Sequence, residues 1–128
     1  MPLLRFVRPE TVTLPLSRGD TITIKRRLSA GEQTDMYARM YRDESVAVDP
    51  TRVHLAVLTT YLLDWSLVDE DGRKVPIADL PYAHLRDVLR SLDPDTFREI
   101  YAAIDAHVDT ENAIRSEEKN VQDGAIAS

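Results

Sequence analysis

Two segments near the start of the chain, residues 11–16 and 21–25, alternate apolar and polar positions with a period of two. This alternation is typical of strands that bury one face. A three-residue loop ending at Gly19 keeps the apolar rows on one face and gives this glycine a positive φ. Pro15 has no N–H to donate, which places the first strand at a sheet edge. The pattern predicts a β-hairpin with these pairs: Val12 with Ile24 and Leu14 with Ile22.

The same arrangement recurs in residues 65–77, which contain the only Trp. A three-residue loop over residues 70–72 would again end at a glycine, Gly72. A two-residue turn would mix the apolar and polar faces, so the longer loop is preferred. We predict a second, short hairpin with these pairs: Trp65 with Ile77 and Leu67 with Val75.

Apolar residues recur at intervals of three and four in four further segments, which predicts four helices. Each segment follows a residue that commonly caps a helix N-terminus: Ser29, Asp49, Asp79 and Asp93. The first helix should reach about Arg42. The second is apolar on most sides, so it should reach about Leu63 and be the most buried element. The stripe of the last helix fails after Val108, because Glu111 and Asn112 occupy the next inward positions.

These elements predict an α+β fold that is mainly helical, with about four helices, an N-terminal β-hairpin and a second short hairpin in the middle. A chain of 128 residues is expected to form one domain. We place this single globular domain at residues 1–116. Residues 109–120 should form a solvated helix, and residues 117–128 should be a disordered tail.

The composition, 43% hydrophobic and 30% charged, is that of an ordinary globular protein. No apolar run approaches the ~18 residues of a membrane span, so no membrane partner is expected. The absence of Cys excludes disulfides and thiol chemistry. The net charge of −6 divides into +4 for residues 1–42 and −10 for residues 43–128. Either the basic part folds onto the acidic part or it binds an acidic protein, whereas an acidic chain disfavours nucleic acid.

Residues that could carry chemistry are scattered, without the spacing of a catalytic or metal site. Residues 69–72 are similar to the start of a calcium loop, but Ala78 stands where a bidentate Glu is needed, so a turn is predicted. His107 and Glu111 share a helix face, yet zinc needs three or four converging ligands, so a solvated helix surface is predicted. We therefore expect no catalytic residue, no metal and no cofactor, and a protein that is not an enzyme.

Apolar and aromatic side chains are the candidates for contacts with a partner protein. Four form the stripe of the first helix, one is the only Trp, and one is a lone apolar residue in the solvated helix: Met36, Tyr37, Met40, Tyr41, Trp65 and Ile114. Met and Tyr are also the residues that adaptable binding surfaces use. A place in the core is the favoured interpretation for the stripe and for Trp65; partner contact is the alternative, which for Trp65 means the edge of a groove.

Five segments occur in an order that is more specific than any one of them: residues 21–32, 36–41, 61–67 with the step Leu63-Asp64-Trp65-Ser66, 71–77 and 92–97. In this order they resemble the tail assembly chaperones of long-tailed, siphovirus-type phages and prophages of actinobacteria and related hosts. The resemblance covers residues 11–108.

The resemblance implies a non-catalytic protein that binds the phage tape measure protein, keeps this long helical partner soluble and assists tail tube assembly. It also implies the tail tube protein as a second partner, a longer frameshifted form, action in the host cytoplasm and absence from the mature virion. Weak self-association is a further expectation. The alternative function is a structural virion component, either a head–tail connector or a minor tail protein, which would remain in purified particles.

Overall fold

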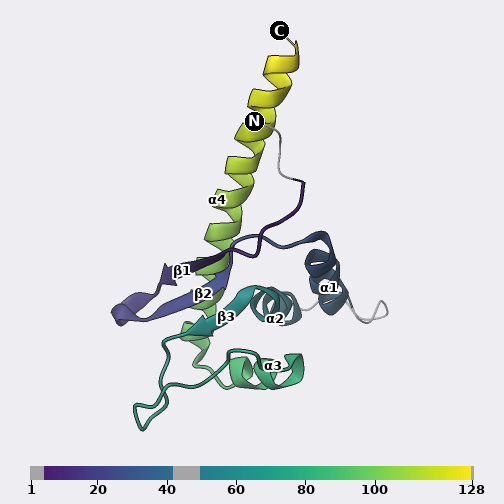
Figure 1. Cartoon of the computed structure of the whole chain (residues 1–128). Coiled ribbons are helices and arrows are strands. Elements are labelled where there is room, and N and C mark those ends of the chain that lie inside the picture. Colours follow the sequence, from purple (N-terminus) through teal and green to yellow (C-terminus); the bar gives the residue numbers. More distant parts are fainter. Residues whose placement is uncertain (1–4, 42–49, 128) are drawn as a thin grey trace.

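The computed structural model describes residues 5–41 and 50–127. Within these residues the chain forms four helices and one three-stranded antiparallel sheet, which confirms the predicted α+β class (Figure 1). The elements in chain order are β1 (Thr11–Pro15), the 3₁₀ turn η1 (Ser17–Gly19), β2 (Thr21–Lys25), α1 (Ala30–Met40), α2 (Pro50–Tyr61), β3 (Leu62–Trp65), α3 (Tyr82–Arg90) and α4 (Pro94–Ala127).

The first hairpin has the predicted register. Both predicted pairs between β1 and β2 are present: Val12 with Ile24 and Leu14 with Ile22. The strand order is β1-β2-β3, so β1 lies at the sheet edge, as the proline at position 15 requires. Gly19 has a φ of 81°, as predicted, and Arg18 also adopts the left-handed region with a φ of 60°. The turn therefore places one non-glycine residue in a conformation that the sequence did not indicate.

α2 ends at Tyr61, so the predicted continuation of this helix to Leu63 is wrong. Residues 62–65 form β3, which pairs antiparallel with β2 and adds the third strand. The hydrogen bonds of this ladder join segments about forty residues apart, so tertiary pairing outweighs the helical pattern of the local sequence. The register shifts between Thr23 and Ile24 of β2, as it does at a β-bulge, and Leu63 is the residue left without a cross-strand partner in this ladder.

The second hairpin keeps its predicted register over a short length. One bridge joins Val68 to Lys74, in the register of the predicted pairs, and the loop ends at Gly72 with a φ of 75°. The Asp69 carboxylate accepts hydrogen bonds from two backbone N–H groups of the loop, at 2.9 and 3.0 Å. These bonds confirm the turn predicted for residues 69–72. In the described structure no regular strand follows Lys74 in this hairpin.

Two of the four predicted helix caps are present in the described residues. Ser29 and Glu32 form a capping box at α1, in which Ser29 Oγ accepts from Glu32 N and the Glu32 carboxylate accepts from Ser29 N. Asp93 caps α4 by accepting from two backbone N–H groups of its first turn. Asp79 does not cap α3, because it has a φ of 61° and the helix begins three residues later. Asp49 lies outside the described residues.

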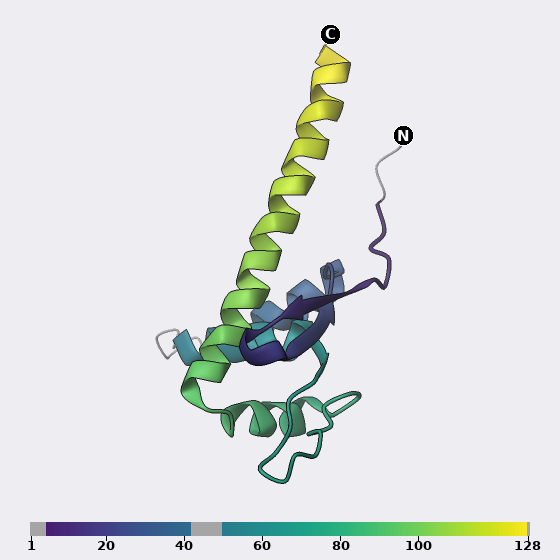
Figure 2. The ribbon, with the colours of Figure 1, turned by 90° about the vertical axis from the view of Figure 1, so that its left-hand side faces the viewer.

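The core lies between one face of the sheet and the helices. Its fully buried large side chains come from β2, α2, α3 and α4: Ile22, Ile24, Leu58, Leu89, Ile100 and Ile104. Both views place the sheet against the N-terminal half of α4 (Figures 1 and 2). α2, expected to be the most buried element, is buried mainly along its C-terminal half. The alternation of β2 and the spacing of α4 thus meet in one core.

α4 continues without a break to Ala127, and its C-terminal part projects beyond the rest of the molecule (Figure 2). The boundary predicted at residue 116 therefore falls inside a continuous helix, where a disordered tail was expected. The apolar stripe ends earlier, which removes packing, but residues such as Glu117 and Glu118 have good helix propensity. Neither this helix nor any other within residues 5–41 and 50–127 has the length and apolar character needed to cross a bilayer.

Candidate functional site

A groove of about 340 Å³ lies between the second hairpin and the corner that joins α3 to α4. We call it the Trp65 groove. Its apolar lining comes from β3, the hairpin, α3 and the residues after α3: Trp65, Leu67, Val68, Val75, Val88 and Leu92. Its polar lining consists of Asp69, Ser91, Asp93 and Thr96. The volume lies at the lower end of the range for binding pockets, which is large enough for one or two bulky side chains.

Trp65 joins the groove to the core. Its side chain is only 3% exposed, and its indole Nε1 donates a 2.8 Å hydrogen bond to the backbone oxygen of Val75 across the hairpin. This bond satisfies the buried indole N–H and fixes one wall of the groove relative to β3. Val68 lies on the open side with 57% of its surface exposed. The groove therefore has a rigid aromatic base and an accessible apolar edge.

Two carboxylates, Asp69 and Asp93, line the groove together with its apolar residues. Asp69 Oδ1 accepts from the hairpin backbone, and Asp93 Oδ2 accepts from the first turn of α4. These bonds hold both carboxylates in place and use one oxygen of each. The second oxygen of each carboxylate takes no part in these bonds. An apolar groove with two fixed negative charges favours an apolar segment that carries positive charges beside it.

The structure separates the side chains that the sequence marks for partner contact. Met36 and Met40 of α1 are buried in the core, which is the favoured interpretation of this stripe. Tyr37 of α1 and Tyr41, the C-cap residue of this helix, are exposed. Ile114 is exposed on α4, while Trp65 is buried and also lines the groove. The accessible members of the set are therefore Tyr37, Tyr41 and Ile114, and Trp65 contributes through the base of the groove.

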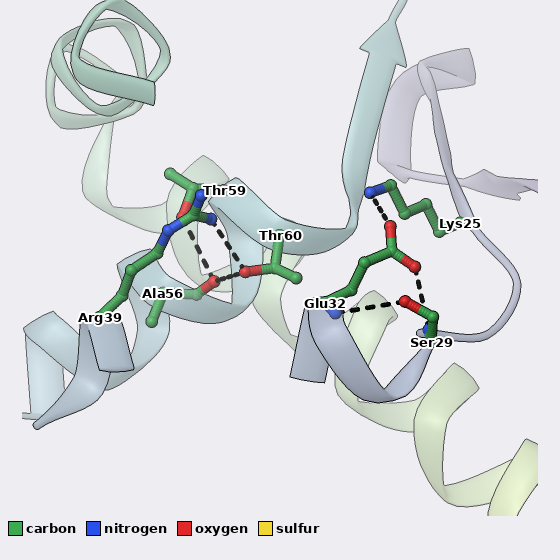
Figure 3. A network of polar contacts seen from close by, with 7 residues as sticks. All are labelled: Lys25, Ser29, Glu32, Arg39, Ala56, Thr59 and Thr60. Atoms are coloured by element: carbon green, nitrogen blue, oxygen red, sulfur yellow. Dashed lines mark hydrogen bonds and ion pairs between the residues drawn. The ribbon is translucent and has the colours of Figure 1, made fainter. Parts of the chain in front are cut away.

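A second, smaller hollow of about 100 Å³ lies over α1 and α2 and is lined by polar side chains. Figure 3 shows that most of these side chains take part in one of two separate sets of polar contacts. Lys25 pairs with Glu32, and Arg39 donates to Thr60 at 3.1 Å. The hydrogen bond from Lys25, followed by the backbone hydrogen bond at Ser29, lowers the pKa of Glu32. Because these groups are occupied in joining α1 to β2 and α2, we assign this hollow a structural role.

Arg39 also extends this polar network to α3. Its guanidinium lies 4.4 Å from the centre of the Tyr82 ring, in the geometry of a cation–π contact. Since Arg39 belongs to α1, Thr60 to α2 and Tyr82 to α3, one side chain links three helices. This arrangement supports the interpretation of the second hollow as part of the framework.

The prediction of a solvated helix surface at His107 and Glu111 is wrong. Glu111 is 9% exposed, and its two carboxylate oxygens accept from Arg26 Nε at 3.1 Å and Arg27 Nε at 2.9 Å. His107 Nε2 lies 2.9 Å from the backbone oxygen of Arg26. The residues that follow β2 cross α4 here, so the basic part of the chain does fold onto the acidic part. Arg26 also pairs with Glu10 at 2.7 Å.

The electrostatics of this cluster favour the charged carboxylate. Burial on its own would raise the pKa of Glu111, but the hydrogen bonds from Arg27 and Arg26 outweigh burial, and the pKa is lowered. The pKa of Arg26 is raised, first by its hydrogen bond to Glu10 and then by that to Glu111. The cluster fixes Glu10, the end of β2 and α4 relative to one another, which is a structural arrangement.

The histidines do not gather into a reactive group. His54 of α2 stacks on Tyr101 of α4 with 3.9 Å between the ring centres. His84 is exposed on α3. Across residues 5–41 and 50–127, no three His, Asp or Glu side chains are placed to hold a metal ion. Among the described residues, the Trp65 groove is therefore the candidate binding site.

Sequence reasoning missed most of the groove. The one sign of the groove in the sequence is Val68. It follows Leu67 directly, so it places an apolar residue where the alternation of the strand calls for a polar, outward-facing one. Val88 and Leu92 have the helical spacing of core residues, and nothing in that spacing distinguishes a half-buried wall from the interior. Comparison of the chain with protein-family models, with curated proteins and with solved structures gave no match.

Proposed function

We propose that this chain is a non-catalytic protein-binding protein, a phage tail assembly chaperone that binds the tape measure protein and assists tail tube assembly. It acts in the host cytoplasm and is absent from the finished particle. The observation that carries the proposal is the Trp65 groove, an open apolar recess bordered by two fixed carboxylates. The sequence resemblance over residues 11–108 supports the choice of partner.

The groove suits an amphipathic helix. A helix presents apolar side chains at intervals of three and four, and one or two of them fit a recess of about 340 Å³. Lys or Arg residues beside the apolar stripe would pair with Asp69 and Asp93. A long helical protein has many such stripes and aggregates when they are bare. Modest affinity per site suffices, because successive sites on one partner raise the local concentration.

Co-expression with the tape measure protein tests this function. Wild-type protein should keep the partner in the soluble fraction, and partner helices should shift the fluorescence of Trp65, the only Trp of the chain. Val68→Lys puts a positive charge on the accessible edge, and it should weaken binding at least about tenfold because the partner's own basic residues are repelled. Ala102→Lys puts the same charge at an exposed position of α4 outside the groove and should bind as wild type does.

The outcomes separate the parts of the proposal. If the partner is equally soluble with and without wild-type protein, the chaperone function is wrong. If Val68→Lys binds as Ala102→Lys does, the function stands and the groove is not its site. Recovery of the chain as a stoichiometric part of purified particles would instead establish the alternative, a structural virion component.

A further inference from the structure

The segment before β1, residues 5–8, has the sequence Arg-Phe-Val-Arg and is exposed throughout. Phe6 is 90% exposed, and Val7 is exposed beside it. An aromatic side chain left in water forgoes the free energy that burial would provide, so this pair is an unusual feature on the surface of a small protein. The arginines on either side, Arg5 and Arg8, make the segment apolar in the middle and basic at both ends.

This pattern is complementary to the Trp65 groove. The groove is apolar and is lined by the carboxylates of Asp69 and Asp93, whereas the segment has an apolar pair between two arginines. A phenyl ring fits a recess of about 340 Å³ lined by Trp65, Val68 and their neighbours. Each arginine would pair with one of the two aspartates, which places the apolar pair between them in the groove.

The segment does not reach the groove of its own chain. Glu10 lies beside Arg26, whose N–H donates to Glu10 O at 3.0 Å, and Arg26 O in turn lies 2.9 Å from His107 Nε2. Glu10 lies four positions after Phe6, which is at most ~14 Å of extended chain. His107 lies eleven positions after Thr96, the groove residue on α4, which is ~16 Å along the helix axis.

The direction of the segment increases this separation. In both views residues 5–10 run toward the C-terminal end of α4, away from the second hairpin and the α3–α4 corner (Figures 1 and 2). The remaining walls of the groove belong to that hairpin and corner, beyond Thr96. In this structure the segment therefore lies away from the groove of its own chain and is free to contact a second molecule.

We propose that residues 5–8 of one copy bind the Trp65 groove of a second copy, with Phe6 in the apolar recess and the two arginines beside Asp69 and Asp93. The contact joins two different surfaces, so a pair of copies keeps one free segment on one copy and one free groove on the other. It does not depend on the partner proposed above. Where that partner also uses the groove, the segment and the partner helix exclude each other, so self-association falls as partner is added.

Sedimentation equilibrium at rising protein concentration, up to about 1 mM, which is the weak end of specific association, tests the contact. The average mass of wild-type protein should rise with concentration. Phe6→Glu and Val68→Lys should each remain monomeric, with at least about tenfold weaker association, because each places a repelling charge in the contact. Both side chains are exposed, so neither change disturbs the core, and circular dichroism verifies the fold. Tyr41→Glu alters an exposed aromatic residue elsewhere and should associate as wild type does.

A mixture of the two monomeric variants is the decisive sample. The Phe6→Glu chain has an intact groove and the Val68→Lys chain has an intact segment, so an equimolar mixture should form one-to-one dimers and nothing larger. A wild-type protein that stays monomeric, a Phe6→Glu variant that associates like wild type, or a mixture that stays monomeric would each overturn the proposal. Phe6→Glu should still keep the tape measure protein soluble, so loss of self-association and loss of chaperone function are distinguished.

Discussion

Arg27 Nε lies 2.9 Å from Oε2 of Glu111, and this ion pair fastens the segment after β2 to the middle of α4. Arg26 occupies the other carboxylate oxygen at 3.1 Å, so one buried acid on α4 receives two cations from adjacent residues. The pairing explains why an acidic residue can occupy an inward position of a helix: its charge is balanced by hydrogen-bonded guanidinium groups.

Replacement of Glu111 by Ala should lower the free energy of unfolding by roughly 1–2 kcal/mol. The change removes two charge-assisted hydrogen bonds, and the loss is limited because both arginines are partly exposed to water. Urea unfolding followed by Trp65 fluorescence measures it. Glu117→Ala is the matched control, since it removes an exposed Glu from the same helix and should change the free energy by less than ~0.5 kcal/mol. Equal effects of the two substitutions would contradict a stabilising role for the cluster.

The same carboxylate predicts a pH dependence. The pKa of Glu111 in the folded protein is below its ordinary value of 4.5, because hydrogen bonds from Arg27 and Arg26 outweigh the opposing effect of burial. A lowered folded pKa means that the stabilisation is complete above pH 4.5 and is lost as the pH falls below that value. The difference in unfolding free energy between wild type and Glu111→Gln should therefore be largest above this pH and shrink below it. A difference that grows on acidification would contradict this assignment.

Two glycines should respond to alanine with opposite signs. Gly31 lies in α1 with open space around the position of an added Cβ, so Gly31→Ala should raise the free energy of unfolding by about 0.5–1 kcal/mol. Gly72 also has open space, but its φ of 75° is unfavourable for a residue with a Cβ. Gly72→Ala should therefore lower the free energy by about 1–2 kcal/mol. Chemical denaturation of both variants compares them directly, and equal signs would contradict the backbone explanation.

The first hairpin and the α1 cap show where local sequence is sufficient. The register of β1 and β2 follows from the alternation, because a shift of one residue would turn every apolar side chain away from the core. The start of α1 follows from Ser29 and Glu32, whose side chains bind the backbone within one turn. Both features depend on residues close together in the chain, so they could be read before any tertiary contact was known.

The end of α2 shows where local sequence is insufficient. Residues 62–65 continue an apolar helical pattern, yet they form β3 because β2 offers an open row of hydrogen-bonding groups. The candidate contact residues divided for a similar reason. Met36 and Met40 turn toward the core and Tyr37 and Tyr41 turn to solvent, although all four belong to one stripe in the sequence. Which side chains of α1 face inward depends on the position of α2, the helix against which α1 packs.

By itself the sequence determined the fold class, the register of the first hairpin, the three-residue turns ending at Gly19 and Gly72, and the α1 cap. These features arise from backbone geometry and short-range hydrogen bonds, which leave periodic signals in the chain. Only the tertiary structure decided that Glu111 is buried between two arginines and that Val68, Val88 and Leu92 line one groove with Trp65. Burial and recesses are properties of surfaces that meet from distant parts of the chain, so no local pattern specifies them.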